Sequence, residues 1–114
     1  MDNQNHQTRV VNRYKDKFDI DIGRLQGKKH HYGNPFSHLG SSSLAIIKVC
    51  SRNYAIDAFR NWLSETDYLD VEPERRDWIL ANLGFLKNKT LGCYCKPKSC
   101  HGDVLIEFIE KMEL

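Results

Sequence analysis

Residues 89–112, with the sequence KTLGCYCKPKSCHGDVLIEFIEKM, predict a buried strand, a short loop and a helix in direct succession. Segment 89–94 suits a strand, and residues 100–112 place apolar side chains at the spacing of one helical face. These side chains are Val104, Leu105, Phe108, Ile109 and Met112. Because ligands of parallel sheets bind beyond the carboxyl ends of the strands, we expect the loop from Cys93 to His101 to lie at a functional site.

Further strands are predicted on the N-terminal side of this segment. Valines begin a strand over residues 8–14, and apolar and acidic residues alternate over residues 18–22. A short apolar run over residues 44–49 is also typical of a strand. The polar loop between them, residues 24–43, is long for a small domain, and loops of this length are usually functional or mobile.

Two helices are predicted between these strands and the final strand. The first is capped by Ser51 or Asn53, and the second runs from Pro73 to a C-cap at Gly84. Strands come first and then alternate with helices, a pattern typical of α/β proteins. We therefore predict an α/β fold with a small single-domain sheet, partly parallel, and about three helices.

Composition bounds the class of protein. The 114 residues fit one α/β domain, which we place at residues 8–114 after a disordered tail over residues 1–7. No apolar run approaches the roughly 20 residues of a membrane helix and no signal peptide is evident, so we expect a cytoplasmic protein without membrane contact. The net charge of +2 is too small to indicate nucleic acid by itself. Four lysines nevertheless flank the cysteine cluster: Lys87, Lys89, Lys96 and Lys98.

The cysteine cluster is compatible with a metal site. Three thiolates and one imidazole, from Cys93, Cys95, Cys100 and His101, are a ligand set that zinc prefers. The C-x-C spacing departs from the usual zinc knuckle, and adjacent Cys100 and His101 would strain binding to one ion. Three of these side chains with a water in the fourth position would make a catalytic zinc site. Zinc is the cofactor that this alternative predicts.

Without a metal, the same cluster predicts a reactive thiolate. Cys100 lies at the expected start of the last helix, where exposed amides and the helix dipole favour an anion. His101 would serve as an acid or base partner, and Asp103 would cap the first turn, which makes these three the candidate catalytic residues. The same amides would also suit a phosphate or carboxylate. A third interpretation makes the remaining cysteines small buried core residues: Cys50, Cys93 and Cys95.

The long polar loop supplies the candidate ligand-binding residues. Asn34 would present its amide to a base or ribose, Phe36 or Tyr32 would stack on the ligand, and Gly33 permits backbone conformations closed to other residues. Arg24 would pair with a phosphate or carboxylate. The plainer interpretation is that the segment around Gly33 and Asn34 is only a turn and that Arg24 is a solvated surface residue. Two histidines are expected to be exposed, because no second histidine follows at a metal spacing: His30 and His31.

Several motifs of this chain occur together in a known family. They are Ile22-Gly23-Arg24, Gly33-Asn34-Pro35-Phe36, the helix from Ser51 to Leu63, and the cysteine segment of residues 91–105. In this combination the chain resembles the uncharacterised family known as domain of unknown function 4326, which is found in phages, bacteria and archaea. The family name supplies no activity. The resemblance, which covers nearly all of residues 8–112, implies that the two motifs form one shared site.

These candidates lead to two functional hypotheses. In the first, the domain binds a nucleotide or nucleoside-like ligand between the GNPF loop and the Cys/His cluster and acts on it, with N-glycoside cleavage or transfer as the reaction class considered. In the alternative, it is a zinc-stabilised, non-catalytic module that binds nucleic acid or a protein through its lysines, including a phage inhibitor of a host protein. Salt dependence separates the two, because a polyanion binder weakens steeply as salt rises.

Overall fold

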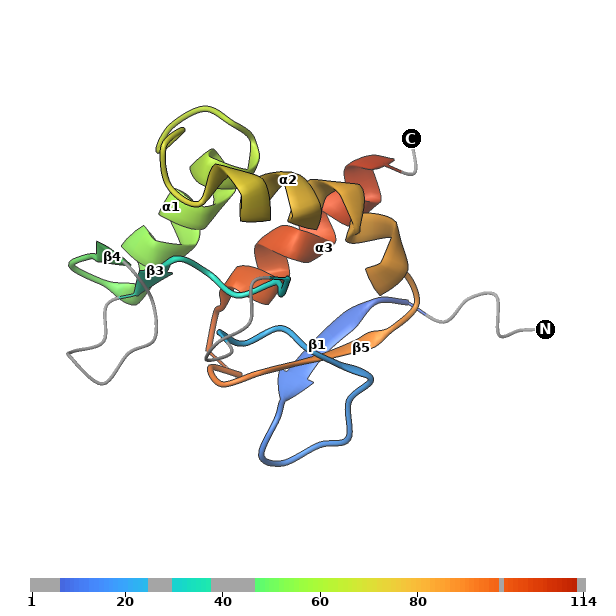
Figure 1. The fold of residues 1–114 in the computed structure, drawn as a ribbon. Coiled ribbons are helices and arrows are strands. Elements are labelled where there is room, and N and C mark those ends of the chain that lie inside the picture. The colour runs from blue at the N-terminus through green and yellow to red at the C-terminus, as the bar shows by residue number, and fades with distance from the viewer. Residues whose placement is uncertain (1–6, 25–29, 38–46, 97, 113–114) are drawn as a thin grey trace.

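The computed structural model describes residues 7–24, 30–37, 47–96 and 98–112, and Figure 1 shows their arrangement. Three short parallel strands form the main sheet in the order β1–β5–β2. Their bounds are Arg9–Asn12 for β1, Ile20–Asp21 for β2 and Thr90–Cys93 for β5. All residues of β5 are buried, because β5 lies between the other two strands. This pairing confirms the predicted parallel character of the sheet.

A second pair of strands lies partly where the sequence predicts an unbroken loop. β3 (Phe36–Ser37) pairs in parallel with β4 (Ile47–Lys48), and the Ile47 amide donates to the Pro35 carbonyl at 2.9 Å. The loop prediction is therefore wrong at β3, because a two-residue strand is too short to show an alternating pattern. The segments 25–29 and 38–46 lie outside the described residues.

Three α-helices lie within the part of the chain that the structure describes, close to their predicted positions. α1 spans Arg52–Leu63, α2 spans Pro73–Ala81 and α3 spans His101–Met112. The Ser51 hydroxyl accepts the Tyr54 amide at 3.0 Å and caps α1, as its residue type predicts.

The C-terminal end of α2 differs from the prediction. Gly84 is not the C-cap, because it lies inside a 3-10 helix, η2, that spans Leu83–Leu86. Asn82 takes the capping position, and its amide donates to the carbonyls of Trp78 and Ile79. The chain thus turns into a tighter helix before it reaches the glycine.

α3 lies in the centre of the fold. Figure 1 shows it between the main sheet and α1, and it contacts both β1 and α1. Gly102 allows its close approach to the sheet, since an added Cβ would lie 2.7 Å from Ile22 Cδ1 and 2.8 Å from Val10 Cγ2. Phe59 and Trp62 of α1 are fully buried, as their helical spacing predicts. Helices packed on a small parallel sheet confirm the α/β class.

Individual predictions of burial have mixed outcomes. Cys50 is exposed and not a core residue, because it lies in the turn before α1. His31 is buried, which corrects the expectation of an exposed loop histidine, whereas His30 is exposed as predicted. Trp78 is only half-buried. Among the described residues, no helix is both long enough and apolar enough to cross a membrane.

Candidate functional site

The carboxyl ends of the three parallel strands meet at one edge of the main sheet. β5 ends at Cys93 and continues through the cysteine segment into the first turn of α3, beside the ends of β1 and β2. The Asn12 side chain at the end of β1 donates to the Lys96 carbonyl at 2.6 Å and holds the cysteine segment to the sheet. The cysteine segment therefore lies at the ligand-binding edge typical of parallel sheets, as the sequence predicts.

Two sulfurs of the cluster are in direct contact. Cys93 Sγ and Cys100 Sγ lie 3.1 Å apart, and both side chains are buried. The hydrogen bond with Cys100, together with the backbone amides of Cys95 and Lys96, lowers the pKa of Cys93 to about 6 despite its burial. The same sulfur–sulfur contact and burial raise the pKa of Cys100, whose sulfur also accepts the Gly102 amide. The two backbone amides therefore favour a negative charge on Cys93, whereas the sequence suggested Cys100.

Asp103 caps the first turn of α3, as the sequence predicts. Its Oδ2 accepts the backbone amide of Cys100 at 3.2 Å, and its Oδ1 lies 2.7 Å from the Lys96 ammonium. The carboxylate thus joins the helix start to the cysteine segment. Because Asp103 is engaged with both partners, it has a positioning role in this structure.

His101 connects the two sequence motifs. Its Nε2 lies 2.7 Å from the Ile22 carbonyl, and because a carbonyl can only accept, Nε2 carries the hydrogen. Its ring packs edge-on against Phe59 with centroids 5.1 Å apart. Burial lowers the pKa of His101 to about 4, against the opposing effect of the Ile22 and Tyr32 backbones. The imidazole is therefore neutral and bonded to the segment after β2, so it is not the acid–base partner of the sulfur pair in this structure.

The four predicted metal ligands are only partly brought together. Cys93 and Cys100 touch, whereas the His101 ring is hydrogen-bonded to Ile22. Within residues 7–24, 30–37, 47–96 and 98–112, no group of three or more His, Cys, Asp or Glu side chains is arranged to hold a metal ion. The zinc site stays a prediction from residue types, and this arrangement of side chains does not add to it.

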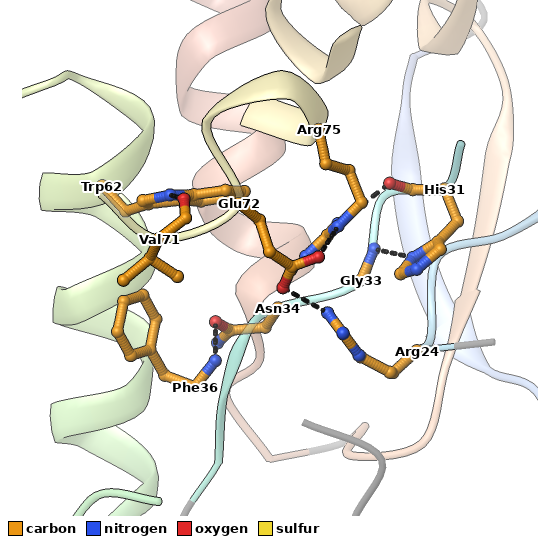
Figure 2. Close-up of polar contacts among 9 residues, drawn as sticks. All are labelled: Arg24, His31, Gly33, Asn34, Phe36, Trp62, Val71, Glu72 and Arg75. Carbon is orange, nitrogen blue, oxygen red and sulfur yellow. Dashed lines mark hydrogen bonds and ion pairs between the residues drawn. The ribbon is translucent and has the colours of Figure 1, made fainter. Parts of the chain in front are cut away.

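The GNPF segment uses its polar atoms internally, as Figure 2 shows. The Asn34 side chain donates to the Ala55 carbonyl at 3.0 Å and accepts the Phe36 amide at 2.9 Å. The Phe36 ring is buried and lies 4.7 Å from the Tyr68 ring. Asn34 therefore closes a turn and ties it to α1, and Phe36 is a core residue. These contacts favour structural roles for Asn34 and Phe36 over roles in binding a ligand.

A partly buried group of ion pairs lies beside this segment. Glu72 Oε1 accepts Arg75 Nε at 2.8 Å, and its Oε2 accepts Arg24 Nη1 at 2.9 Å. Arg75 also donates to the His31 carbonyl at 3.0 Å. Figure 2 shows the Glu72 carboxylate between the two guanidinium groups, which lower its pKa against the effect of burial. Arg24 is thus neither a simple solvated residue nor an isolated anion binder.

Sequence reasoning missed Glu72 and Arg75. Glu72 precedes Pro73 in the left-handed region, with φ 36° and ψ 57°, a strained conformation for a residue with a side chain. That conformation is found where its carboxylate meets Arg75 and Arg24. Arg75 is only 5% exposed and lies on the buried side of a short helix. A charged residue at such a position was the signal that could have identified it.

Gly33 and His31 complete the packing around Arg24. An added Cβ at Gly33 would lie 2.7 Å from Arg24 Cα and 2.9 Å from the His31 ring, so only glycine fits. The Gly33 amide donates to His31 Nδ1 at 3.0 Å. Burial, followed by the charges of Arg75 and Arg24, lowers the pKa of His31 to about 4. We call the residues His31, Gly33, Glu72, Arg75 and His101 the buried junction.

Two exposed tyrosines lie just beyond the carboxyl ends of β1 and β5 in the main sheet. Tyr94 is 46% exposed and its ring lies against Gly23, where a Cβ would overlap it. Tyr14 is 74% exposed, and its ring centroid is 5.7 Å from that of Tyr94. The Arg13 guanidinium lies 4.6 Å from the centroid of the Tyr94 ring and donates to its hydroxyl. We call Arg13, Tyr14, Gly23, Arg24 and Tyr94 the edge surface.

The four lysines do not gather at this surface. Lys87 and Lys89 precede β5, whereas Lys96 and Lys98 follow it, so the two pairs lie at opposite ends of the strand. Lys96 is paired with Asp103, and Lys89 lies over the Phe85 ring. The lysines therefore do not form one continuous basic patch.

Comparison with known proteins gives a family but no activity. A family model described as "Domain of unknown function (DUF4326)" matches residues 3–111, which include both motifs. A curated protein of Enterobacteria phage T4, described as "Uncharacterized 12.4 kDa protein in nrdA-td intergenic region", is 32% identical over 104 residues. That alignment covers 91% of this chain and 79% of the phage protein. No solved structure matches the chain.

Proposed function

The chain belongs to the DUF4326 family of domains of unknown function, and from the geometry of its sheet edge we propose that it binds a nucleotide or nucleoside-like small molecule there. The observation that carries the proposal is the edge surface, where two exposed tyrosine rings lie beside the Arg13 guanidinium at the carboxyl ends of parallel strands. Ligands of open α/β sheets bind at this position.

The tyrosine rings supply a place for a planar base. Tyr14 and Tyr94 together present exposed aromatic surface, and their phenol rings are held by contacts with each other and with Arg13. Base–aromatic stacking is worth about 1–3 kcal/mol per base and tolerates any base, because every base has a π-face. The edge surface therefore suits a nucleobase without demanding one in particular.

The arginines supply positive charge for an anionic group. Arg13 pairs with Asp21 and Arg24 pairs with Glu72, which also binds Arg75. Arg13 is the guanidinium that lies at the tyrosine rings, and its planar set of donors suits a phosphate or carboxylate. The acids also fix the orientation of the guanidinium groups, which lowers the entropy lost when a ligand binds.

The proposal is for binding, and it assigns different roles to the residues chosen from sequence. Arg24 remains a ligand-binding candidate, whereas Gly33, Asn34 and Phe36 build the frame that holds it. Cys100, His101 and Asp103 are engaged in internal hydrogen bonds, so they are given no step in acting on this ligand.

The test is a titration of the reduced full-length chain with nucleoside monophosphates and the matching nucleosides, followed by amide chemical shifts. We expect shifts around Tyr14, Gly23 and Tyr94, with tighter binding of the monophosphates. Tyr94→Ala should weaken binding about tenfold, the loss of one stacked base. Tyr54→Ala, an exposed tyrosine on α1, is the matched control and should bind like the parent.

The anionic part is tested with a second matched pair. Arg13→Gln should weaken the monophosphate more than the nucleoside, whereas Arg9→Gln at the amino end of β1 should change neither. Shifts confined to the lysine-bearing segments, or an oligonucleotide that binds with a steep loss as salt rises, would favour the nucleic-acid module instead. No shift at the edge surface with any nucleotide would rule the proposal out.

A further inference from the structure

The sulfur pair is not used by the proposed ligand site, yet its arrangement is that of a reactive dithiol. Cys93 Sγ and Cys100 Sγ lie 3.1 Å apart, with side chains only 1% and 2% exposed. A disulfide needs a separation of about 2.05 Å, so closing the bond requires the sulfurs to approach by about 1 Å. The two cysteines come from the end of β5 and the residue before α3, and between them the Lys98 amide donates to the Cys95 carbonyl at 2.8 Å across a turn.

Hydrogen-bond donors surround Cys93 asymmetrically. Its sulfur accepts the backbone amides of Cys95 and Lys96 and shares one thiol hydrogen with the Cys100 sulfur. The Cys100 sulfur in turn accepts the Gly102 amide in the first turn of α3. Two backbone amides stabilise an anion on Cys93, against one on Cys100, and a thiolate is the nucleophile in thiol oxidation. Cys93 is therefore placed to react first, with Cys100 as its neighbour.

We propose that Cys93 and Cys100 form a redox-active dithiol that a peroxide oxidises to an intramolecular disulfide. The Cys93 thiolate attacks one peroxide oxygen, the O–O bond breaks, and Cys93 becomes a sulfenic acid while the leaving hydroxide takes up a proton. Cys100 then attacks the Cys93 sulfur, its thiol proton leaves with the displaced hydroxide as water, and the S–S bond forms. The two sulfurs lose two electrons, which reduce one hydrogen peroxide to two waters. A dithiol reductant reverses the change by thiol–disulfide exchange.

The other two cysteines provide internal controls. Cys50 is exposed in the turn before α1, away from the sulfur pair in sequence and on a different element. Cys95 is partly buried and its neighbour in sequence is the exposed Tyr94. If exposure alone governed oxidation, Cys50 would react first. If the local geometry governs it, the buried pair reacts first, and that contrast distinguishes the dithiol from unselective damage.

The experiment treats the reduced full-length chain with hydrogen peroxide, blocks the remaining thiols with an alkylating reagent, and maps the cysteines by mass spectrometry. We expect loss of two alkylatable thiols per chain, a peptide linking Cys93 to Cys100, and full recovery with dithiothreitol. Cys50→Ser should behave identically. A disulfide that involves Cys50 or Cys95, or oxidation of Cys50 ahead of the pair, would overturn the proposal.

Single variants test the order of the steps and guard against misfolding. Cys100→Ser should stop at a Cys93 sulfenic acid, which dimedone captures, whereas Cys93→Ser should give no capture at Cys100. Folding of each variant is checked by its amide spectrum, and Cys50→Ser again provides the parent-like reference. If dimedone labels Cys100 and not Cys93, the assigned order is wrong. If the purified parent holds one zinc per chain that protects both thiols from peroxide, the pair is a metal site and the proposal falls.

The proposals of a dithiol and of a ligand site can be disproved independently. Nucleotide binding is measured on the reduced chain, and disulfide formation is measured without any ligand. A chain that binds nucleotides but never links Cys93 to Cys100 loses only the dithiol. A chain that forms the disulfide but binds no nucleotide loses only the ligand site.

Discussion

In the buried junction, the imidazoles of His31 and His101 and the guanidinium of Arg75 find their partners inside the chain, whereas Arg13, Tyr14 and Tyr94 at the edge surface lie partly in solvent. Both regions adjoin the same few residues after β2, and both use polar side chains. The difference shows that a polar residue in a motif can stabilise the fold as readily as it can bind a ligand. Four substitutions or conditions, taken from the largest expected effect to the smallest, sharpen this comparison.

Acidification should have the largest effect, because it charges the junction. Burial is the main cause that lowers the pKa of both His31 and His101 to about 4, below the ordinary histidine value of 6.5 that applies when the chain is unfolded. Between these two values the unfolded chain binds protons that the folded chain does not bind. The stabilisation from the two histidines is therefore complete above pH 6.5 and is lost as the pH falls towards 4. Each histidine contributes up to about 3 kcal/mol to this loss, since one pKa unit corresponds to about 1.4 kcal/mol.

Urea unfolding at a series of pH values between 7.5 and 4 measures this slope. His101→Gln and His31→Gln should each flatten it by removing one titrating group, although each variant starts from a lower stability. His30→Gln, which removes an exposed imidazole of the same segment, is the matched control. Equal slopes in the parent and in both junction variants would show that the junction histidines do not titrate as described.

Breaking the ion pairs of the junction should be the next largest effect. Glu72→Gln removes the counterion of Arg75, whose side chain is only 4% exposed, and we expect a loss of about 3 kcal/mol because a buried charge is left uncompensated. Glu107→Gln breaks the pair with Arg60, in which both side chains are about 40% exposed, and should cost less than about 1 kcal/mol. Chemical denaturation of the two variants compares buried with exposed pairs directly. Similar losses of stability in the two variants would mean that burial does not strengthen the ion pairs of the junction.

Three glycine substitutions grade the tightness of packing. Gly33→Ala should cost about 2–3 kcal/mol, because its Cβ meets the Arg24 backbone, which cannot move aside. Gly102→Ala should cost about 1–2 kcal/mol, since the side chains of Ile22 and Val10 can shift. Gly84→Ala is the control and should be close to neutral, because its nearest neighbour is Met112 Cε at 3.9 Å. Any other order of the urea unfolding midpoints of the three variants would contradict these contacts.

The elements of the fold could be predicted from the sequence because their signals are local. The apolar spacing in α3, the serine cap of α1 and the proline at the start of α2 each lie within the element that they define. β3 could not be predicted, because a two-residue strand is defined by its partner, which lies elsewhere in the chain. The same reason applies to Gly84, whose conformation depends on how η2 packs.

The role of each site residue depended on contacts between distant segments. Arg24 and Glu72 are 48 residues apart, and Arg75 lies 44 residues from the His31 carbonyl that it binds. No local pattern reports such pairs, so Asn34 and Phe36 were assigned to the ligand while Glu72 and Arg75 were missed. Tyr94 lies inside the cysteine segment of residues 91–105. Its exposure follows only from its position beyond the last residue of β5.

The smallest effect on stability is expected at the edge surface. Tyr14→Ala removes a ring that is 74% exposed and whose described ring contacts are with Tyr94 and Arg13. Because little apolar area is lost from the folded state, we expect a change within about 0.5 kcal/mol, as for other surface substitutions. Differential scanning fluorimetry of Tyr14→Ala beside Gly33→Ala measures the contrast on one scale. A loss at Tyr14 as large as that at Gly33 would mean that the ring holds the sheet edge together, and the reason to regard it as a surface kept open for a ligand would disappear.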